Sequence, residues 1–337
     1  MFKRNLALAL AVVLVMSIVA GCAGGGNEGA NAKVGMITDT GGLGDQSFND
    51  SAYDGLQRAE EEFGVEVSVL ESSTADDYGP NLTSFAEENM DLTIGVGFLF
   101  EESMKTAADQ FPEKNFAIVD AVVDKPNVAS LTFKEHQGSF LVGVIAAQAT
   151  ETNKIGFIGG QEFPLIQKFE YGFRAGVKSV NPDAEVIVNY ANSFEDAAKG
   201  KEIAKAQHDL GADVIYHAAG GVGLGLMEAA EEEDFWAIGV DKDQSGLAPE
   251  NVLCSMVKRV DNATFLITES IVNENFEGGK VYSYGLADDG VGVSDEAGNL
   301  PSEYKELSDK YKKAIVDGEF EVPSTPEEFD AWEVPEI

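Results

Sequence analysis

Short apolar runs recur along the chain, and longer stretches with apolar residues at helical spacing separate them. Short runs of this kind predict buried strands, and the longer stretches predict amphipathic helices. Residues 33–38 (KVGMIT) form the first run, and Ala52, Leu56, Ala59 and Phe63 follow it as an apolar stripe of helical period. The two patterns alternate through the chain, which favours an α/β protein with parallel sheets covered by helices.

A glycine-rich turn joins this first strand to the first helix. Ser47 and Asp50 have the spacing of a capping box, so we expect Phe48 in the first helical turn. In open α/β sheets, ligands bind where the carboxyl ends of strands meet the amino ends of helices. The turn therefore predicts a small-molecule pocket that includes Phe48. The alternative is that Phe48 only continues the apolar core stripe.

The strand patterns of the first half return in the second half. The matched pairs are KVGMIT at 33 with KIGFIG at 154, VEVSVL at 65 with AEVIVN at 184, DLTIGV at 91 with ADVIYH at 212, NFAIVDA at 115 with DFWAIGVDK at 234, and NVASLTF at 127 with NVLCSMV at 251. A doubled unit predicts two similar lobes. Proteins of this design bind their ligand between the lobes and close around it by a hinge motion. We therefore expect two doubly wound parallel sheets joined by hinge crossovers.

The hinge crossovers should follow the fifth strand of each half, near Lys134 and Lys258, with a third crossing near residues 287–295. If the helix after each crossover packs on the opposite lobe, both lobes are discontinuous in sequence. The predicted division is 33–133 plus 259–288 for the first lobe, 134–258 plus 289–321 for the second lobe, and 322–337 for a C-terminal surface strap.

Residues 1–21 have the features of a lipoprotein signal peptide. Lys3 and Arg4 precede an apolar run that is short for a permanent membrane anchor. The run ends in VAGC, which resembles a bacterial lipobox in which Cys22 becomes lipidated. Residues 22–32 then predict a flexible tether, and we expect a lipid-anchored protein of the cell membrane that faces the extracytoplasmic side. The alternative is an ordinary secretory signal with a chance cysteine.

The chain is strongly acidic, with 59 acidic against 23 basic side chains and a formal net charge of -36. Such a charge repels phosphate backbones and anionic head groups, which argues against nucleic acid binding and against membrane contact other than through the lipid anchor. The acidic residues are scattered, as on a solvated surface suited to a saline habitat, where salt screens their repulsion. With Cys22 committed to lipid, Cys254 has no disulfide partner and is expected to be buried.

Polar residues at equivalent positions of the two halves suggest how a ligand is held. Asp120 and Asp241 end the fourth strands of their halves, and we expect both to face the cleft without a basic partner other than Lys242. They would accept hydrogen bonds from hydroxyl or amine groups, whereas the alternative is that each caps a turn. Lys258, at the predicted hinge, is expected to donate hydrogen bonds, unless it is simply a solvated charge.

Aromatic residues complete the predicted cleft. Phe48 in the first half and Tyr216 in the second are expected to face each other and to clamp a flat heteroaromatic ring. Phe169 occupies the repeat position of Phe48, and Asp45 and Gly220 are further candidates for the ligand site.

Eight ordered motifs resemble those of the basic membrane lipoprotein family. Members of this family are substrate-binding lipoproteins of ABC importers, similar to the purine nucleoside receptors. They are the lipobox, GGLGDQSFN at 41, AEENMDL at 86, AIVDAVV at 117, QGSFLVG at 137, HAAGGVGLG at 217, IGVDKDQ at 238 and SMVKR at 255. The resemblance implies a type I periplasmic-binding-protein fold. It also implies a monomer without a cofactor that delivers guanosine, adenosine or inosine to ABC permease subunits.

The resemblance also assigns roles to residues. Phe48 and Tyr216 would stack on the base, Asn49 and Asp120 would address the base, and Asp241 and Lys258 would address the ribose. A receptor of the same fold for a sugar, a nucleobase or a furanone signal remains open.

A more remote alternative to a receptor is an enzyme, for example one with a Rossmann-like fold. The sequences TGGLGDQS and GGVGLGLM lack the G-x-G-x-x-G spacing of dinucleotide-binding turns. The chain has no Walker motif, and its three histidines form no H-E-x-x-H metal motif. We therefore expect neither catalysis nor a metal site.

Overall fold

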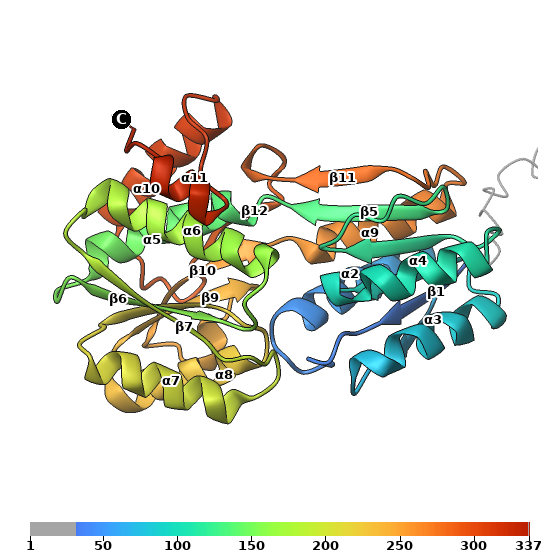
Figure 1. Cartoon of the computed structure of the whole chain (residues 1–337), viewed down its shortest axis with the longest axis horizontal. Helices are drawn as coiled ribbons and strands as arrows, with labels where there is room; N and C mark the ends of the chain where they lie inside the picture. Colours follow the sequence, from blue (N-terminus) through green and yellow to red (C-terminus); the bar gives the residue numbers. More distant parts are fainter. Residues whose placement is uncertain (1–31, 336) are drawn as a thin grey trace, which may run out of the picture. The chain divides into compact units, whose positions relative to one another are not determined.

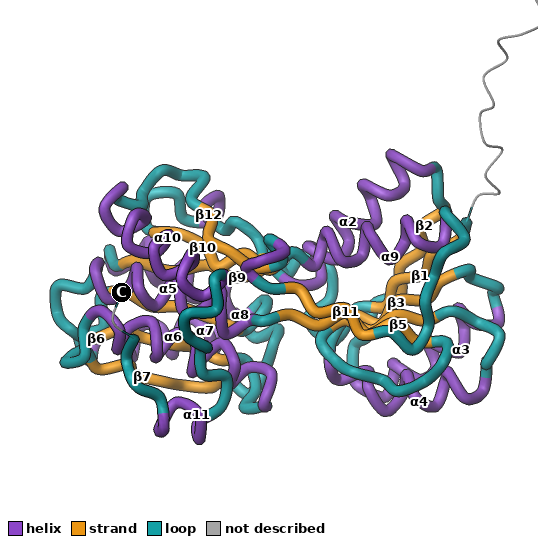
Figure 2. The backbone as a smooth tube through the Cα atoms, turned by 90° about the horizontal axis from the view of Figure 1, so that it is seen from above, coloured by secondary structure: helices purple, strands orange, loops and turns teal. Residues whose placement is uncertain are grey.

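The computed structural model describes residues 32–335 and 337, which contain two six-stranded sheets. The predicted signal peptide and Cys22 lie outside the described residues. The first sheet has the order β11-β5-β4-β3-β1-β2 and consists of β1 (Lys33–Ile37), β2 (Glu66–Leu70), β3 (Leu92–Val96), β4 (Phe116–Val119), β5 (Val128–Phe133) and β11 (Val281–Tyr284). The second has the order β12-β10-β9-β8-β6-β7 and consists of β6 (Lys154–Gly159), β7 (Glu185–Tyr190), β8 (Val214–Ala218), β9 (Trp236–Asp241), β10 (Val252–Lys258) and β12 (Val291–Ser294). Figures 1 and 2 show the two sheets as separate bodies.

The two sheets have the same topology, which confirms the predicted fold class and the internal repeat behind it. Each strand of the first sheet has a counterpart at the same place in the second, from β1 and β6 to β5 and β10. Within each sheet, neighbouring strands run parallel, with one exception at the edge of the second sheet. The last strand of the first sheet, β11, runs parallel to β5, whereas β12 runs antiparallel to β10.

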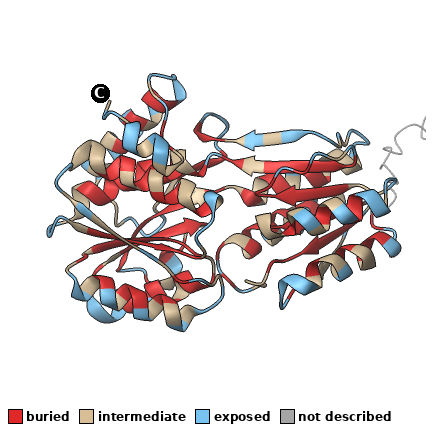
Figure 3. Cartoon of the chain, viewed as in Figure 1, coloured by how far each residue is buried: buried red, intermediate tan, exposed pale blue. Residues whose placement is uncertain are grey.

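Helices cover both faces of each sheet (Figure 1). In the first sheet α2 packs on α9 and α3 on α4, and in the second α5 packs on α6 and α10, and α7 on α8. The apolar residues of the strands point into these layers, so the buried positions follow the strands and the inner helix faces (Figure 3). The helices are α2 (Phe48–Phe63), α3 (Tyr78–Glu87), α4 (Glu101–Gln110), α5 (Glu135–Ala149), α6 (Pro164–Val180), α7 (Ala197–Asp209), α8 (Val222–Glu233), α9 (Val260–Val272), α10 (Ser302–Val316) and α11 (Pro326–Ala331).

Two helices cross between the sheets. Helix α5 follows β5 of the first sheet but packs against β10 and β12 of the second, whereas α9 follows β10 and packs against β3. Helices α5 and α6 approach so closely at Gly143 that a Cβ atom there would lie 2.2 Å from the carbonyl oxygen of Phe173. We call each sheet with its packed helices a lobe, and we keep the predicted residue boundaries of the lobes and of the strap as a proposal.

Candidate functional site

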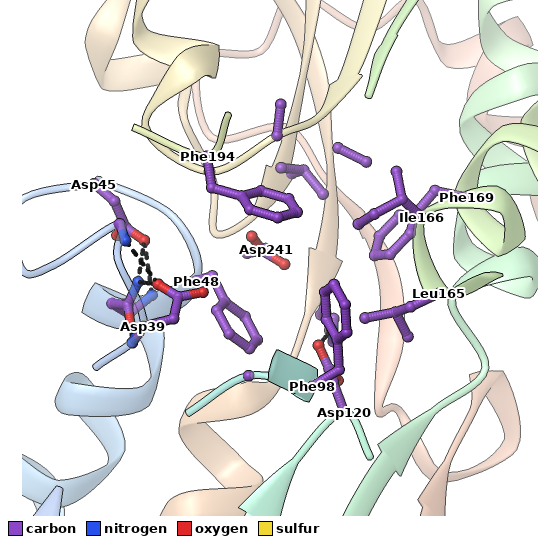
Figure 4. A pocket seen from close by; sticks show the side chains of 18 residues that line it. Asp39, Asp45, Phe48, Phe98, Asp120, Leu165, Ile166, Phe169, Phe194 and Asp241 are labelled. Carbon is purple, nitrogen blue, oxygen red and sulfur yellow. Dashed lines mark hydrogen bonds and ion pairs between the residues drawn. The ribbon is translucent and has the colours of Figure 1, made fainter. Parts of the chain in front are cut away.

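A cavity lies between the carboxyl ends of the strands of the two lobes, and the space in it that no atom fills, open solvent included, is about 520 Å³. Most residues predicted for the ligand site line this cavity, and they are Asp45, Phe48, Asn49, Asp120, Phe169, Gly220, Asp241 and Lys258. Figure 4 labels Asp45, Phe48, Asp120, Phe169 and Asp241 among them, which come from both lobes and surround one space.

The prediction that Tyr216 faces the cleft is wrong. Tyr216 lies in the middle of β8, is fully buried, and packs against the rings of Phe157 and Phe173. Its hydroxyl group lies 3.1 Å from the Ser139 hydroxyl. The cavity lies beyond the ends of the strands, so a side chain in the middle of a strand is covered by the helices of its own lobe.

Phe194 forms the aromatic wall that was predicted at position 216. It lies in the loop between β7 and α7 and points into the cavity opposite Phe48 (Figure 4). Gly220, with a positive φ of 56°, passes close to this loop, since a Cβ atom there would lie 3.0 Å from the carbonyl oxygen of Phe194. The signal for Phe194 was the repeated pattern SFND at 47 and SFED at 193.

Further cavity residues were also missed from the sequence. They are Asp39, Phe98, Leu165 and Ile166, with Val240 at the end of β9. Phe98 follows β3 and meets Phe163 and Phe194 of the opposite lobe edge-on, with ring centroids 5.1 and 6.3 Å apart. Asp39 lies in a loop, whereas Leu165 and Ile166 begin helix α6 and Val240 lies near the end of β9, so each of these residues is at or near the end of an element, where apolar periodicity does not mark a site.

Asp45, and not Ser47, caps helix α2, so the predicted capping box is wrong. The carboxylate of Asp45 accepts hydrogen bonds from the backbone N–H groups of Ser47, Asn49 and Asp50 at 2.8 to 3.1 Å. Asp50 instead accepts from the N–H groups of Gly44 and Gln46. The Ser47 hydroxyl therefore makes no capping hydrogen bond to its own helix.

Ser47 uses its hydroxyl to reach the other lobe. Its Oγ donates to Oδ2 of Asp241 at 2.6 Å. Beside it, the side-chain amide of Gln244 donates to the carbonyl oxygen of Gln46 at 3.0 Å, and His217 fixes this amide by donating to its oxygen at 2.8 Å. Burial lowers the pKa of His217 to about 4, so its ring is neutral at pH 7. These bonds hold the two lobes together on one side of the cavity.

Lys258 links the lobes deeper in the cavity. Its Nζ lies 2.5 Å from Oδ2 of Asp120 and 3.6 Å from Oε1 of the fully buried Glu135, so the prediction that Asp120 has no basic partner is wrong. Burial lowers the pKa of Lys258, but the carboxylates of Asp120, Glu135 and Asp241 outweigh burial and raise it above its usual value. Lys258 is therefore a buried cation, not a solvated charge.

Asp120 and Asp241 have the same unusual backbone conformation, with φ values of 68° and 65°. Residues other than glycine rarely adopt this region, and they gather at functional sites. Burial raises the pKa of Asp241 to about 7 and also raises the pKa of Asp120. The repeat thus places two equivalent carboxylates, one from each lobe, at the same cavity.

Asp39 and Asn49 form a second polar pair beside Phe48. The Asn49 amide donates to Oδ1 of Asp39 at 2.8 Å and to Oδ2 of Asp45 at 3.1 Å, while its oxygen accepts from the Asp39 N–H group at 3.3 Å (Figure 4). Burial raises the pKa of Asp39 to about 6. The pair orients acceptor groups toward the cavity at the edge of the Phe48 ring.

This arrangement can enclose a flat, uncharged molecule that carries many hydrogen-bond donors. Aromatic side chains line both lobes, and the polar groups are mostly carboxylates. Within residues 32–335 and 337, no group of three His, Cys, Asp or Glu residues is placed to hold a metal ion. In the same part of the chain, every helix is too short or too polar to cross a membrane.

The fold and the site define a two-lobed solute-binding protein of the type I periplasmic class. Structural comparison agrees: a solute-binding protein of an ABC transporter system from Aeropyrum pernix K1 superposes with a TM-score of 0.81 at 29% identity, covering 89% of this chain and 96% of that one. A related protein from Conexibacter woesei gives a TM-score of 0.71 at 25% identity, covering 87% of this chain and 99% of that one.

The family follows from the sequence comparison. Residues 32–326 match the family described as "ABC transporter substrate-binding protein PnrA-like", and the chain belongs to this family. It is 38% identical to the ABC transporter nucleoside-binding protein BmpA of Lactococcus lactis, covering 96% of this chain and all of that protein. It is 36% identical to basic membrane protein A of Borreliella burgdorferi, covering 96% of this chain and 97% of that protein. Substrate-binding proteins of this kind are not enzymes.

Proposed function

We propose that the protein captures a purine nucleoside in the cavity between its lobes and delivers it to an ABC permease. The observation that carries this proposal is the placement of Phe48 and Phe194 on opposite walls of one cavity that also contains Asp241 and Lys258. Two facing aromatic rings suit a flat base, for which stacking contributes about 1 to 3 kcal/mol per ring. The nucleoside-binding name of the Lactococcus lactis relative supports the same ligand class.

The polar residues of the cavity would divide by the part of the nucleoside that they bind. Asp39, Asn49 and Asp120 would address the base, and Asp241 and Lys258 would bind the ribose hydroxyls. Asp45 lines the cavity, but both of its oxygens already accept bonds from the start of α2. We therefore assign Asp45 to the stability of the loop.

The proposed place of action is the outer face of the cell membrane. The lipobox motif at residues 19–22 supports attachment through a lipid on Cys22, which leaves the two lobes outside the cytoplasm to meet the permease. Metabolic labelling with a palmitate analogue tests this anchor, with Cys22→Ala as the control that should lose the label.

A thermal unfolding assay of the purified mature protein tests the ligand class. A ligand at 100 times its dissociation constant adds about 2.7 kcal/mol to the free energy of unfolding, which shifts the melting temperature measurably. We expect guanosine or inosine to raise this temperature and ribose to leave it unchanged. Stabilisation by ribose alone, or by a free nucleobase alone, would instead identify a receptor of the same fold for another ligand.

A further inference from the structure

The free side-chain hydrogen-bonding groups of the cavity are mostly acceptors. Among the described residues, Oδ1 of Asp120 is buried without a partner, and Oδ1 of Asp241 and Oδ2 of Asp39 have no protein donor. Both amide hydrogens of Asn49 are already used, so its side chain can only accept further bonds. Lys258 is the one described side chain of the lining with donor capacity to spare. A ligand that satisfies these side chains must itself supply donors.

The loop fixes which oxygen of Asp39 faces the ligand. Oδ1 accepts from the Gly41 N–H group at 2.9 Å and from the Asn49 amide at 2.8 Å. Oδ2 lies on the other side, where it borders Gly97: a Cβ atom at Gly97 would lie 3.3 Å from this oxygen and 3.6 Å from the Phe48 ring. Asp39, Gly97 and Phe48 all line the cavity. A base stacked on Phe48 therefore meets Oδ2 of Asp39 at its edge.

We propose that the site selects 6-oxopurine nucleosides, guanosine and inosine, over adenosine, because Oδ2 of Asp39 faces ring nitrogen N1 of the base. This inference rests on the nucleoside function proposed above. In guanine and hypoxanthine N1 carries a hydrogen that a carboxylate accepts, and guanine adds a second donor in its 2-amino group. In adenine N1 carries a lone pair, which repels the carboxylate and leaves a buried acceptor unsatisfied.

The expected preference is large enough to measure. Sites built to pair with a ligand N–H discriminate strongly against analogues without it, because a buried partner is then left unpaired. We expect guanosine to bind about tenfold to a hundredfold more tightly than adenosine at pH 7.5, with inosine close to guanosine. At this pH Asp39 is ionised, since its pKa is about 6.

Titration calorimetry of the three nucleosides with the wild-type protein and with Asp39→Asn tests the inference. In the variant, Oδ1 keeps its two bonds to Gly41 and Asn49, so the amide nitrogen takes the place of Oδ2 and donates where the carboxylate accepted. We expect guanosine to bind more weakly and adenosine more tightly, so that the preference falls by at least tenfold. Asp76→Asn changes an exposed carboxylate outside the cavity and should keep the wild-type preference.

The outcomes separate this inference from the nucleoside function. If adenosine binds the wild-type protein as tightly as guanosine, the selection is wrong while the nucleoside function stands. An unchanged preference in Asp39→Asn, with normal thermal unfolding of the variant, also overturns the role of Asp39. If no nucleoside binds the wild-type protein, it is the nucleoside function itself that fails.

Discussion

The two lobes share one topology but build opposite kinds of cavity wall. The first lobe supplies polar groups, with Asp39, Asn49 and Asp120 beside the Phe48 ring, whereas the second supplies mainly apolar groups such as Ile166 (Figure 4). Asp241 and Lys258 are the polar exceptions of the second lobe. The difference indicates that the first lobe reads the hydrogen-bonding pattern of the ligand while the second excludes water from it.

The internal repeat shows which positions account for this difference. The carboxylates that end β4 and β9, Asp120 and Asp241, are retained in both halves with the same backbone conformation. In contrast, the repeat position of Asp39 is Gly160, where a Cβ atom would lie 2.2 Å from the Phe194 ring. The first lobe thus has a carboxylate at this position, whereas the second has a glycine that leaves space for the ring of Phe194.

The two equivalent lysines at the crossovers give the largest expected effect. Lys258 is 1% exposed and paired with Asp120, whereas Lys134 is exposed. Lys258→Met leaves buried carboxylates without their cation, which typically costs about 3 to 5 kcal/mol. We expect that loss in the free energy of unfolding, measured by urea denaturation.

Lys134→Met is the matched control for this experiment. Surface substitutions usually change stability by about 0.5 kcal/mol or less, so its unfolding curve should overlay that of the wild type. Equal losses in both variants would mean that burial of Lys258 between carboxylates is not what distinguishes the two crossovers.

The aromatic wall of the second lobe gives the next largest effect. Phe194→Ala removes one face of the proposed stack, so we expect nucleoside affinity to fall by about 1 to 3 kcal/mol in titration calorimetry. Tyr216→Phe is the control, because it removes only the hydroxyl that meets Ser139 inside the core. Tyr216→Phe should lower stability slightly and leave affinity unchanged. If Tyr216→Phe weakened nucleoside binding and Phe194→Ala did not, Tyr216 would be the ligand contact after all.

The sequence predicted the fold better than it predicted the second lobe's part of the site. Period and repetition identify strands such as β1 and β6, because buried strands demand unbroken apolar runs. They also identify Asp120 and Asp241, since these residues follow directly from their strands. Phe194 and Asp39 escaped because loop residues are placed by contacts distant in sequence. The partner of Lys258 escaped for the same reason, since Asp120 belongs to the other lobe.

A pH titration of stability isolates the carboxylate that the second lobe contributes. The pKa of Asp241 is raised by burial from 3.8 to about 7. Between these values the folded protein holds a proton on Asp241 that the unfolded chain has released, so this group makes stability fall as pH rises. We expect the free energy of unfolding of Asp241→Asn, relative to wild type, to increase from pH 4 to pH 7 by at most about 1.4 kcal/mol per pH unit.

The comparison with the variant is needed because buried histidines act in the opposite direction. The pKa values of His136 and His217 are lowered to about 4 by burial, so these groups make stability rise with pH between about 4 and 6.5. Both are present in wild type and variant, and their contribution cancels in the difference. A difference that is flat across this range would show that Asp241 is not a protonated buried acid in the folded protein.

The smallest effect is expected from an exposed ion pair that also joins the two lobes. Lys242 of the second lobe lies 2.5 Å from Asp54 on α2 of the first, but their side chains are 31% and 46% exposed. Exposed pairs typically contribute about 0 to 1 kcal/mol and weaken with salt. Lys242→Met should therefore change nucleoside affinity by less than about fivefold, and Asp54→Asn in the same background should add little. A loss of affinity in Lys242→Met well above fivefold would mean that this exposed pair contributes to holding the two lobes around the ligand.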